Sequence, residues 1–540
     1  MEVEQMPNVY EIIREHVLLS ISCIDRLYIN GYLPTMQTDD QVRYFLEHHR
    51  GNPVPSPALF RPIHDRFVGS IKAFAERQQV PMIAFERRQR KDDVVAEYRS
   101  RFRRRQGVVL IGTAQERAWS FKGSKKSRSS GGFTFGFTRQ SVAVNHYYFY
   151  LLDPEWGPAF LKIGSYAPYP VKLCLNGHEW VKQRLRRERI RYEALDNGFL
   201  SCRKPERLQE ICDELGPEHV QAFFDRWSRH LPWPLTPEDR AAGYEHRLTL
   251  WQMEVSLTQV FDRPVQGRHF FEQVIRDNLD LGRPDRIRLL FPKKITRSTP
   301  PPRRGWRTRV LIDGVDPSLH IDYKRSHVKQ YFKLQRALRT ETTINHPADF
   351  GASKGLQNLP YLRRLAHGVN RRILEAERVG HNCALSQDAL DHMQKPTIKD
   401  GQRASALRFG DPRVMALLHA LCSFQHLQHG FRNRDLRRHV AALLGWSLEL
   451  YTSGRMTYDL RRLRLKGLIT RLPGTNRYVV TTHGLRVALF CSKVYLRILR
   501  PGWACLGQPE PIPRPLRTAF TRLETEIHKL CDATHLRPAA

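Results

Sequence analysis

The sequence lacks the patterns that mark several large protein classes. No apolar run comes near the roughly 20 residues that a membrane-spanning helix needs. The nine cysteines are scattered and include no CxxC pair, which argues against a zinc ribbon and against a secreted disulfide framework. Three motifs are also missing: the phosphate loop GxxxxGK followed by Ser or Thr, the nucleophile elbow GxSxG and the zinc motif HExxH. ATP hydrolysis therefore has no motif to support it.

The beginning of the chain, MEVEQMPNVYEII, is acidic and does not have the features of a signal peptide. Together with the scattered cysteines, this predicts a protein of a reducing compartment, cytoplasmic and associated with the nucleoid. No lipidation signal accompanies the basic charge, so we expect no membrane partner.

Acidic residues are scarce, and this shortage is informative. The chain has 88 Lys and Arg against 54 Asp and Glu, which gives a net charge of +34. A folded protein with such an excess repels itself unless a polyanion relieves the repulsion, and nucleic acid is the usual polyanion. Arg outnumbers Lys, which suits bidentate contacts to phosphate and guanine. The composition favours nucleic acid, and DNA in particular, as the partner; a generally basic chain from an Arg-rich proteome is the alternative.

The predicted fold class is α+β multidomain, with a mixed central α+β region followed by a C-terminal winged helix-turn-helix. A chain of 540 residues is too long for one core. No internal repeat is visible, and the oligomeric state is left open. The predicted regions are a basic N-terminal α+β region 1–135, a hairpin plus helical region 136–300, a central α+β strand region 301–400, a winged helix-turn-helix 405–500, and a Pro-rich tail with one helix 501–540.

Several segments predict particular elements. Residues 1–80 predict helices and a short strand. The runs SVAVNHYYFYLL and PAFLKIGSY, separated by the turn sequence DPEWG, predict a hairpin. In CLNGHEW, Asn176 with Glu179 three residues later fits a capping box at a helix start. The apolar spacing in EHRLTLWQMEVSLTQVF and the segment SHVKQYFKLQ both predict helices.

Basic charge rises sharply between Phe85 and Arg128, with fourteen Lys or Arg against five acidic residues. The stretch 124–132 is rich in Ser and Gly and has no apolar periodicity, which predicts a loop. Such a loop either contacts the phosphate backbone or is simply solvated. The predicted DNA-contacting residues here are Arg103, Arg104, Arg105, Lys125 and Lys126.

Between residues 411 and 500 four features follow one another in the order of a winged helix-turn-helix. A helix pattern is followed by a second, capped near Asn433, and by a third that starts at Thr452 or Ser453; two short strands with a PGTN turn and a last helix complete the order. Leu460, Leu463 and Leu468 can face the core. The third helix is the predicted reader of a major groove. The predicted DNA-contacting residues are Arg455, Tyr458, Arg461, Arg462, Arg464, Lys466 and Arg477.

The stretch GRMTYDLRRLRLKGLITRLPGTNRYVVTTHGLRVAL resembles MarR-like winged-helix modules, in which LxxLxxxGLI precedes the wing. The resemblance covers about ninety residues and implies the fold more firmly than the ligand. Winged helices also serve as protein docking modules, and this alternative stays open. From Arg455 to Arg477, seven basic residues stand against one acidic residue, which favours DNA.

The segment 309–345 carries the candidate catalytic residues. RVLIDG, SLHIDYKR and ALRTETTIN predict strands, and carboxylates on neighbouring strands can bind a divalent metal. A tyrosine close to that metal could attack a phosphodiester. The candidate metal ligands are Asp313, Asp322 and Glu341, for Mg²⁺ or Mn²⁺.

This segment resembles rolling-circle replication initiators, in which a YxK element precedes an RxE strand. The resemblance implies catalytic roles for Tyr331, Lys333, Arg339 and Glu341 in a metal-dependent DNA nickase or strand transferase. The His-apolar-His metal motif of the larger nickase superfamily is absent. The alternative is an ordinary exposed strand and a tyrosine at the edge of the core.

A second enzymatic pattern lies in 145–197, which resembles the opening strands of GIY-YIG nucleases. Tyr148 or Tyr150 would lie on the first strand and Lys162 on the second. Those nucleases need an Arg after the second strand, where this chain has Lys172. They also need a metal-binding Glu, for which Glu179 or Glu188 would have to serve.

Taken together, LNGHEW, RALRTETTIN and GRMTYDLRRLRLKGLI are similar to an uncharacterised bacterial protein family of roughly this length. The similarity implies a bacterial source and no activity. The leading hypothesis is a DNA-binding protein of a mobile element or plasmid, of the replication-initiator or transposase kind. The alternatives are a non-catalytic winged-helix regulator or architectural protein, and an RNA-binding protein whose strand 147–150 stacks bases through its tyrosines.

Overall fold

The computed structural model divides the chain into two compact units. Unit 1 comprises Met1–Leu279 and Pro284–Arg378, and unit 2 comprises Asp280–Arg283 and Val379–Ala540. The structure describes residues 15–86, 89–127, 133–280, 286–287, 306–313, 316–334, 336–381, 387–399, 401–423, 426, 430–499, 518–519, 521–522, 525–526 and 529. Within these residues, no helix combines the length and apolar character that crossing a membrane requires.

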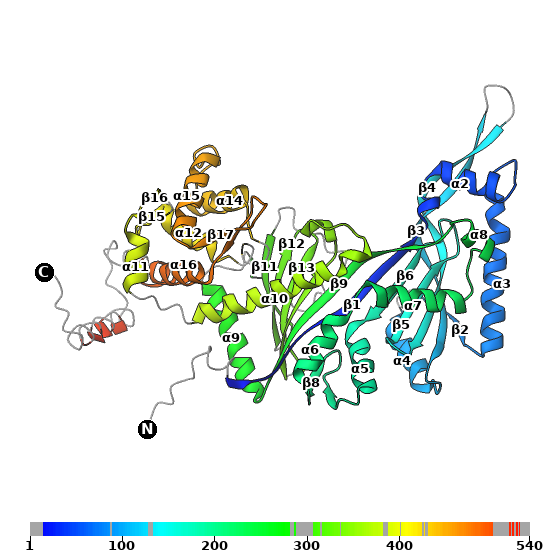
Figure 1. Cartoon of the computed structure of the whole chain (residues 1–540), viewed down its shortest axis with the longest axis horizontal. Coiled ribbons are helices and arrows are strands. Elements are labelled where there is room, and N and C mark those ends of the chain that lie inside the picture. Colours follow the sequence, from blue (N-terminus) through cyan, green and yellow to red (C-terminus); the bar gives the residue numbers. More distant parts are fainter. Residues whose placement is uncertain are drawn as a thin grey trace. The chain divides into compact units, whose positions relative to one another are not determined.

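Unit 1 is built on one sheet of twelve strands (Figure 1). Their order across the sheet is β10-β11-β12-β13-β14-β9-β1-β6-β5-β4-β3-β2. Only the outermost pairs, β2 with β3 and β10 with β11, are parallel. The strands are β1 (Val17–Tyr32), β2 (Met82–Ala84), β3 (Gly107–Ser127), β4 (Phe133–Asp153), β5 (Gly157–Gly164), β6 (Val171–Asn176), β9 (Arg247–Phe261), β10 (Arg286–Ile287), β11 (Trp306–Asp313), β12 (Asp316–Tyr323), β13 (Ser326–Lys333) and β14 (Ala337–Ile344).

Helices and a small hairpin accompany this sheet. The small hairpin is β7 (Tyr192–Ala194) with β8 (Phe199–Cys202). The helices are α2 (Asp39–Tyr44), α3 (Phe60–Gln78), α4 (Lys91–Arg101), α5 (Gly177–Arg187), α6 (Pro205–Glu214), α7 (Pro217–His230), α8 (Pro237–Ala241), α9 (Pro264–Asp280) and α10 (Leu359–His381).

The sheet has an internal duplication. In the first half, β1 is followed by α3, by the short parallel strand β2 and then by β3 to β6 and α5; in the second half, β9 is followed by α9, by β10 and then by β11 to β14 and α10. The long strands β1 and β9 pair antiparallel at the centre, and each half runs outward from its central strand in the same order. This duplication is not visible as a repeat in the sequence. The two halves share the order and pairing of their strands. Such a topology can recur without similar sequences, because it requires only a similar pattern of buried and exposed positions.

One face of the sheet forms the main apolar core. In β1, Leu27 and Ile29 are fully buried, whereas the alternating Tyr28 and Asn30 are partly exposed. Successive side chains of a strand point to opposite faces, so this alternation identifies the buried face. The same apolar cluster takes residues from α3, α5, α6, α7 and α10, which cover that face.

Two predicted helices are strands. Residues 247–261 form β9, and the register shift opposite Tyr28 leaves Trp251 as an extra residue in β9. This bulge separates the buried Leu250 and Met253 by three positions, a spacing that imitates a helix. The first eight residues of SHVKQYFKLQ, Ser326–Lys333, form β13 instead of a helix. The buried positions of β13 include the polar Gln330. The alternation of buried and exposed positions therefore does not appear in the sequence as an alternation of apolar and polar residues.

The local turn and cap signals are confirmed. The DPEWG sequence makes the β4–β5 turn, where Asp153 Oδ1 accepts hydrogen bonds from the backbone N–H groups of Glu155 at 2.8 Å and Trp156 at 2.9 Å. Asn176 caps α5 by accepting the Glu179 N–H at 3.1 Å, but the predicted capping box is not completed, because the Glu179 carboxylate pairs with Lys182. The predicted strands around RVLIDG, SLHIDYKR and ALRTETTIN are β11, β12 and β14.

The predicted boundaries within unit 1 are wrong. The boundary at residue 135 falls inside β4, and the regions 136–300 and 301–400 contribute strands to the same sheet. Cross-strand pairing between distant segments joins them, most directly the pairing of β9 with β1 and β14.

Unit 2 contains the succession of three helices, a hairpin and a helix that the sequence predicts. Thr452 caps the third of these helices by accepting the Arg455 N–H at 3.3 Å, and Leu460, Leu463 and Leu468 are buried as expected. The predicted tail 501–540 lies almost entirely outside the described residues. The elements are α11 (Gln387–Gln394), β15 (Thr397–Lys399), β16 (Gln402–Ala404), α12 (Pro412–Leu421), α14 (Asn433–Leu444), α15 (Ser453–Leu465), β17 (Ile469–Arg471), β18 (Tyr478–Val480) and α16 (Thr482–Val494).

Candidate functional site

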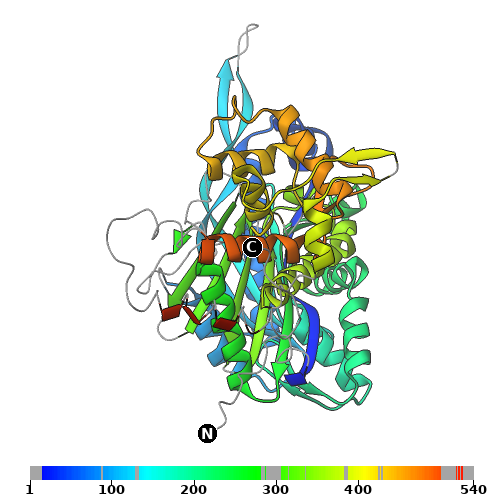
Figure 2. The ribbon, with the colours of Figure 1, turned by 90° about the vertical axis from the view of Figure 1, so that its left-hand side faces the viewer.

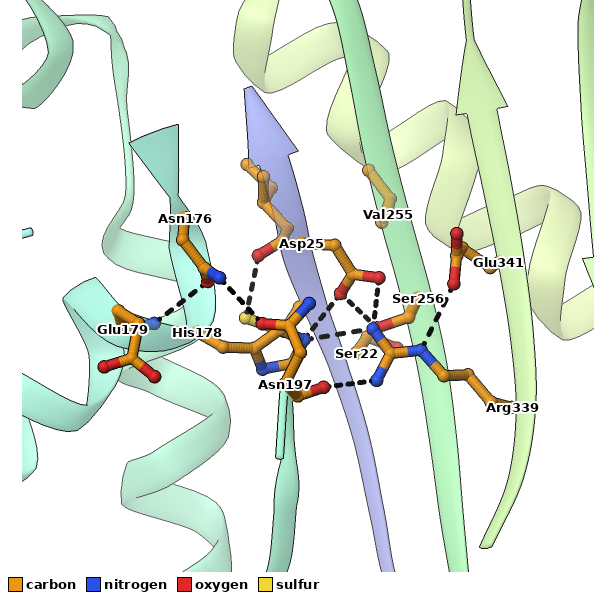
Figure 3. A network of polar contacts seen from close by, with 12 residues as sticks. Ser22, Asp25, Asn176, His178, Glu179, Asn197, Val255, Ser256, Arg339 and Glu341 are labelled. Atoms are coloured by element: carbon orange, nitrogen blue, oxygen red, sulfur yellow. Dashed lines mark hydrogen bonds and ion pairs between the residues drawn. The ribbon is translucent and has the colours of Figure 1, made fainter. Parts of the chain in front are cut away.

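A buried network of charged residues lies where the two halves of unit 1 meet (Figure 3). Its centre is Asp25 in β1. The pairing of β1 with β9 passes from Ile24 opposite Val255 to Arg26 opposite Glu254, so Asp25 is the extra residue of a bulge. A bulge changes the direction of a side chain, and here it places a carboxylate in the interior, where Asp25 is 1% exposed.

Three side chains satisfy the Asp25 carboxylate. His178 Nε2 lies 2.5 Å from Oδ1, the Ser256 hydroxyl donates to the same oxygen at 2.7 Å, and Arg339 forms an ion pair with Oδ2. Burial raises the pKa of Asp25, but Arg339 and His178 outweigh it and hold this pKa well below its usual range. The carboxylate is therefore charged throughout the physiological range.

His178 reaches Asp25 from the first turn of α5. The preceding Gly177 lies against β1, where an added Cβ would come within 2.1 Å of the Ile24 carbonyl oxygen. This close approach requires glycine in the NGHEW sequence. Burial lowers the pKa of His178, but Cys23 and Asp25 raise it to about 9. Because burial keeps the Cys23 thiol protonated by raising its pKa, Asp25 is the charge that holds the imidazole cationic near neutral pH.

Arg339 links the second half to this centre. Besides the Asp25 ion pair, its Nη1 donates to the Asn197 carbonyl in the β7–β8 loop, and its Nε lies 3.3 Å from Glu341 Oε2. The Tyr331 hydroxyl donates to the same Glu341 oxygen at 3.2 Å. Tyr331 and Arg339 are direct cross-strand partners.

The predicted catalytic residues are thus neighbours on β13 and β14. Lys333 joins them less closely, through Asp196 at 3.3 Å and the Asn197 carbonyl at 3.3 Å. Burial, followed by the charge of Glu341, raises the pKa of Tyr331 well above its usual range. Burial and Asp25 also raise the pKa of Glu341. A tyrosine nucleophile here would have to pass its proton to Glu341.

The predicted metal site is not assembled. β13 separates Asp322 in β12 from Glu341 in β14, a distance of roughly 10 Å across the sheet. Asp313 lies in β11, and its side chain is outside the described set. Among the side chains that the structure describes, no three from His, Cys, Asp and Glu are grouped to hold a metal ion.

The nuclease-like strands 145–164 contain a second polar cluster. Tyr148 and Lys162 are cross-strand partners, as the pattern requires, and both contact Glu116 of β3. Lys91 also binds Glu116, at 2.6 Å. Burial raises the pKa of Glu116, but hydrogen bonds from Lys162, Lys91 and Tyr148 lower it to about 2.

The two glutamates proposed as metal ligands for that pattern have other partners. Glu179 pairs with Lys182 at 2.7 Å, and Glu188 pairs with Arg207 at 2.7 Å. The tyrosines at 147, 148 and 150 are buried, so they are not placed to stack on bases. The expectation of an RNA-stacking strand there is wrong.

Two motifs far apart in the sequence meet at Asp25: LNGHEW supplies His178, and RALRTETTIN supplies Arg339 and Glu341. No family model, curated protein or solved structure matches this chain. Sequence reasoning missed Asp25, although a lone acid within the apolar run SISCIDRLYI was a signal for it.

The DNA-contacting residues predicted for the third helix of unit 2 and for the hairpin after it divide into two groups. Arg462 and Lys466 are buried, so their prediction as surface contacts is wrong. Arg462 pairs with Asp459 at 3.2 Å and donates to the Ala406 carbonyl. Lys466 donates to the carbonyls of His392 at 2.8 Å and Lys395 at 2.6 Å. The exposed members are Arg455, Tyr458, Arg461 and Arg464, and Arg477 is half-buried.

The basic residues predicted in unit 1 lie at the surface where they are described. Arg103, Arg104 and Arg105 are exposed between α4 and β3. Lys125 is exposed near the end of β3. The side chain of Lys126 lies outside the described set.

Proposed function

We propose that the protein binds duplex DNA and that α15 is the helix that contacts the major groove. The succession α12, α14, α15, β17, β18 and α16 has the order of a winged helix-turn-helix, in which the third helix enters the groove and the hairpin is the wing. Residues 401–500 contain eighteen Lys and Arg against four Asp and Glu, which provides the charge for phosphate contacts.

One observation carries this proposal: the only acidic residue of α15 is removed from its surface. Asp459 is fully buried and accepts hydrogen bonds from Arg413 at 2.7 Å and from the Tyr451 hydroxyl at 2.6 Å. The charged residues exposed on α15 are therefore all cations: Arg455, Arg461 and Arg464. A phosphate approaching this side meets no carboxylate from the helix.

The β17–β18 hairpin supports the same interface. Arg471 is exposed, and it donates to the Thr475 carbonyl at 2.8 Å and to Asn476 Oδ1 at 2.7 Å within the turn. These bonds fix the shape of the turn. A wing of this kind contacts the backbone beside the groove that the helix occupies.

We expect the double variant Arg461→Ala with Arg464→Ala to lower the affinity of the full chain for duplex DNA. Each phosphate contact contributes about 0.9 to the slope of log affinity against log salt, so the slope should fall by about 1.8. Fluorescence anisotropy with a labelled duplex over a range of salt concentrations measures both quantities.

The matched control is Arg408→Ala with Arg486→Ala, which removes two exposed cations from outside α15 and the hairpin. Its slope should stay close to that of the wild type. Equal slopes for the two double variants would remove α15 from the interface.

DNA nicking by Tyr331, as in a replication initiator or transposase-like protein, is a second candidate function. It is favoured by the Tyr331–Glu341 hydrogen bond, because a carboxylate at that position can accept the phenol proton while the oxygen attacks phosphorus and a sugar oxygen leaves. We expect such an activity to need added Mg²⁺ or Mn²⁺, to leave a covalent protein–DNA adduct, and to disappear in Tyr331→Phe.

Incubation with supercoiled plasmid, with and without the metal, measures nicking. Tyr28→Phe is the control, since Tyr28 is also a partly buried phenol on a strand of this sheet. An intact plasmid with the wild type would exclude this activity and leave the DNA-binding proposal untouched. Nicking that survives Tyr331→Phe would assign the nucleophile elsewhere.

A further inference from the structure

The β3–β4 hairpin is much longer than the sheet requires. β4 pairs with β5 only over His146–Asp153, yet β3 and β4 remain paired as far as Ser127 opposite Phe133. The segments 115–127 and 133–145, called the arm below, are therefore a two-stranded extension. Figures 1 and 2 show it projecting beyond the other strands. The corresponding strands of the second half, β11 and β12, have only eight residues each, so the duplication does not explain the arm.

Glu116, at the base of the arm, is the arm's one acidic residue in the sequence. From Arg117 to Leu152 the sequence contains six Lys and Arg and no Asp or Glu. Four of these cations have exposed side chains: Arg117, Lys122, Lys125 and Arg139. The carboxylate of Glu116 is bound by Lys162, Lys91 and Tyr148.

The arm also exposes a large aromatic side chain. Trp119 lies between Arg117 and Lys122 in sequence and is 62% exposed, the highest exposure among the aromatic residues that the structure describes as exposed. Indole groups are enriched at interfaces, because they combine a large apolar area with a polar N–H. An exposed tryptophan among cations matches a partner that offers both phosphates and apolar sugar surface.

The middle of the arm is held in place by contacts at Ser120, Phe121 and Phe137. Phe121 and Phe137 are buried with Phe60 in an apolar cluster. The Phe137 N–H donates to Asp39 Oδ1 of α2 at 2.8 Å, and the Ser120 hydroxyl donates to the Ala167 carbonyl at 2.5 Å. These contacts fix the direction of the arm, so its cations are presented as a set and with less loss of conformational entropy on binding.

We infer that the arm is a second DNA-contacting element, a ribbon that lies along a groove of the duplex and binds the flanking phosphates. A two-stranded ribbon fits the B-DNA major groove, which is about 12 Å wide. The inference rests on the proposed function, since it assumes that the chain binds duplex DNA. The arm would add a DNA contact in unit 1 that does not depend on α15. The arm and α15 would both bind duplex DNA.

The test compares three variants of the full chain on one duplex of about 40 base pairs over a range of salt concentrations. The arm variant carries Arg117→Ser, Lys122→Ser, Lys125→Ser and Arg139→Ser. Its control carries Lys72→Ser, Arg77→Ser, Arg203→Ser and Lys204→Ser, four exposed cations elsewhere in unit 1, and so has the same net charge. The third variant is Arg461→Ala with Arg464→Ala.

We expect the arm variant to lose at least about tenfold in affinity near 0.1 M salt and its salt slope to fall by about 2 to 4, while the control changes affinity less than about threefold. Trp119→Ala should lower affinity by about threefold to tenfold without changing the slope, because it removes apolar contact and no charge.

The outcomes separate the two proposals. A wild-type chain that does not bind duplex DNA overturns the proposed function and the arm with it. If the α15 variant loses affinity while the arm variant matches its control, only the inference about the arm fails. A single strand bound more tightly than the duplex through the arm would exclude its placement in a groove.

Discussion

Replacing Arg339 with methionine is expected to lower the free energy of unfolding of unit 1 by about 3–5 kcal/mol. The substitution keeps much of the side-chain volume and removes the cation. Asp25 then keeps only the imidazole of His178 as a charged partner, at a position that is 1% exposed. An under-compensated buried carboxylate costs far more than the loss of an exposed ion pair, because no water replaces the missing partner. Urea unfolding followed by tryptophan fluorescence measures the change.

Arg207→Met is the control for removing an arginine. Arg207 is held by Glu188, Glu210 and Glu214 at the surface, where water replaces a lost partner, so we expect no resolvable change in the unfolding midpoint. The double variant Asp25→Asn with Arg339→Met should be more stable than the sum of the single effects predicts, since it leaves less uncompensated charge. A midpoint for Arg339→Met equal to that of the wild type would show that the network does not hold the two halves together.

The second large effect is a loss of stability as the pH rises above neutrality. The pKa of His178 is raised to about 9 in the folded protein, against about 6.5 in an unfolded chain. A group whose folded pKa is raised stabilises the fold fully below its unfolded value, and this contribution disappears as the pH rises through the folded value. The free energy of unfolding should therefore fall by roughly 1 to 3 kcal/mol between pH 6.5 and pH 9.5.

Other groups around His178 do not mask this dependence. Asp25 is already charged over the whole window, because its pKa is lowered, and its own contribution is lost only at acid pH. The raised pKa of Cys23 adds a decline of the same sign above the ordinary pKa of a thiol, and His178→Gln keeps that decline, whereas Arg339 remains cationic. Urea midpoints measured across the window should show the decline in the wild type. They should show a flatter profile in His178→Gln, which cannot titrate; parallel profiles for the two proteins would contradict the assignment.

Local signals in the sequence predicted local structure well. The turn after β4, the cap at Asn176 and the start of α15 at Thr452 depend on residues within a few positions of one another. Such features are determined by backbone geometry and one or two hydrogen bonds, so a short window of sequence contains the information.

The central strands β1 and β9 could not be predicted from a short window of sequence. β1 and β9 pair across more than two hundred residues of sequence, and bulges in both strands interrupt the alternation of apolar and polar residues that identifies a strand. The Asp25–Arg339 ion pair joins residues 314 positions apart. Neither its existence nor its burial follows from the residues beside either partner.

Arg462 and Lys466 were wrongly predicted to lie at the surface for a related reason. Helical periodicity places Arg461 and Arg464 away from the buried leucines, and the structure agrees. Arg462 is buried because Asp459, one turn earlier, is buried with it as an ion pair. A residue's own charge does not reveal whether the interior provides a partner, so a count of cations overstates the surface available to DNA.

The duplicated topology also sets a limit on dividing this protein. Each half contributes one long strand to the middle of the sheet, and that strand presents unpaired N–H and C=O groups wherever its counterpart is missing. A fragment ending before Arg247 would carry such an open edge along β1, together with a carboxylate deprived of its guanidinium. It would be prone to self-association through backbone pairing, and the covalent connection between the halves keeps that edge closed within a single chain.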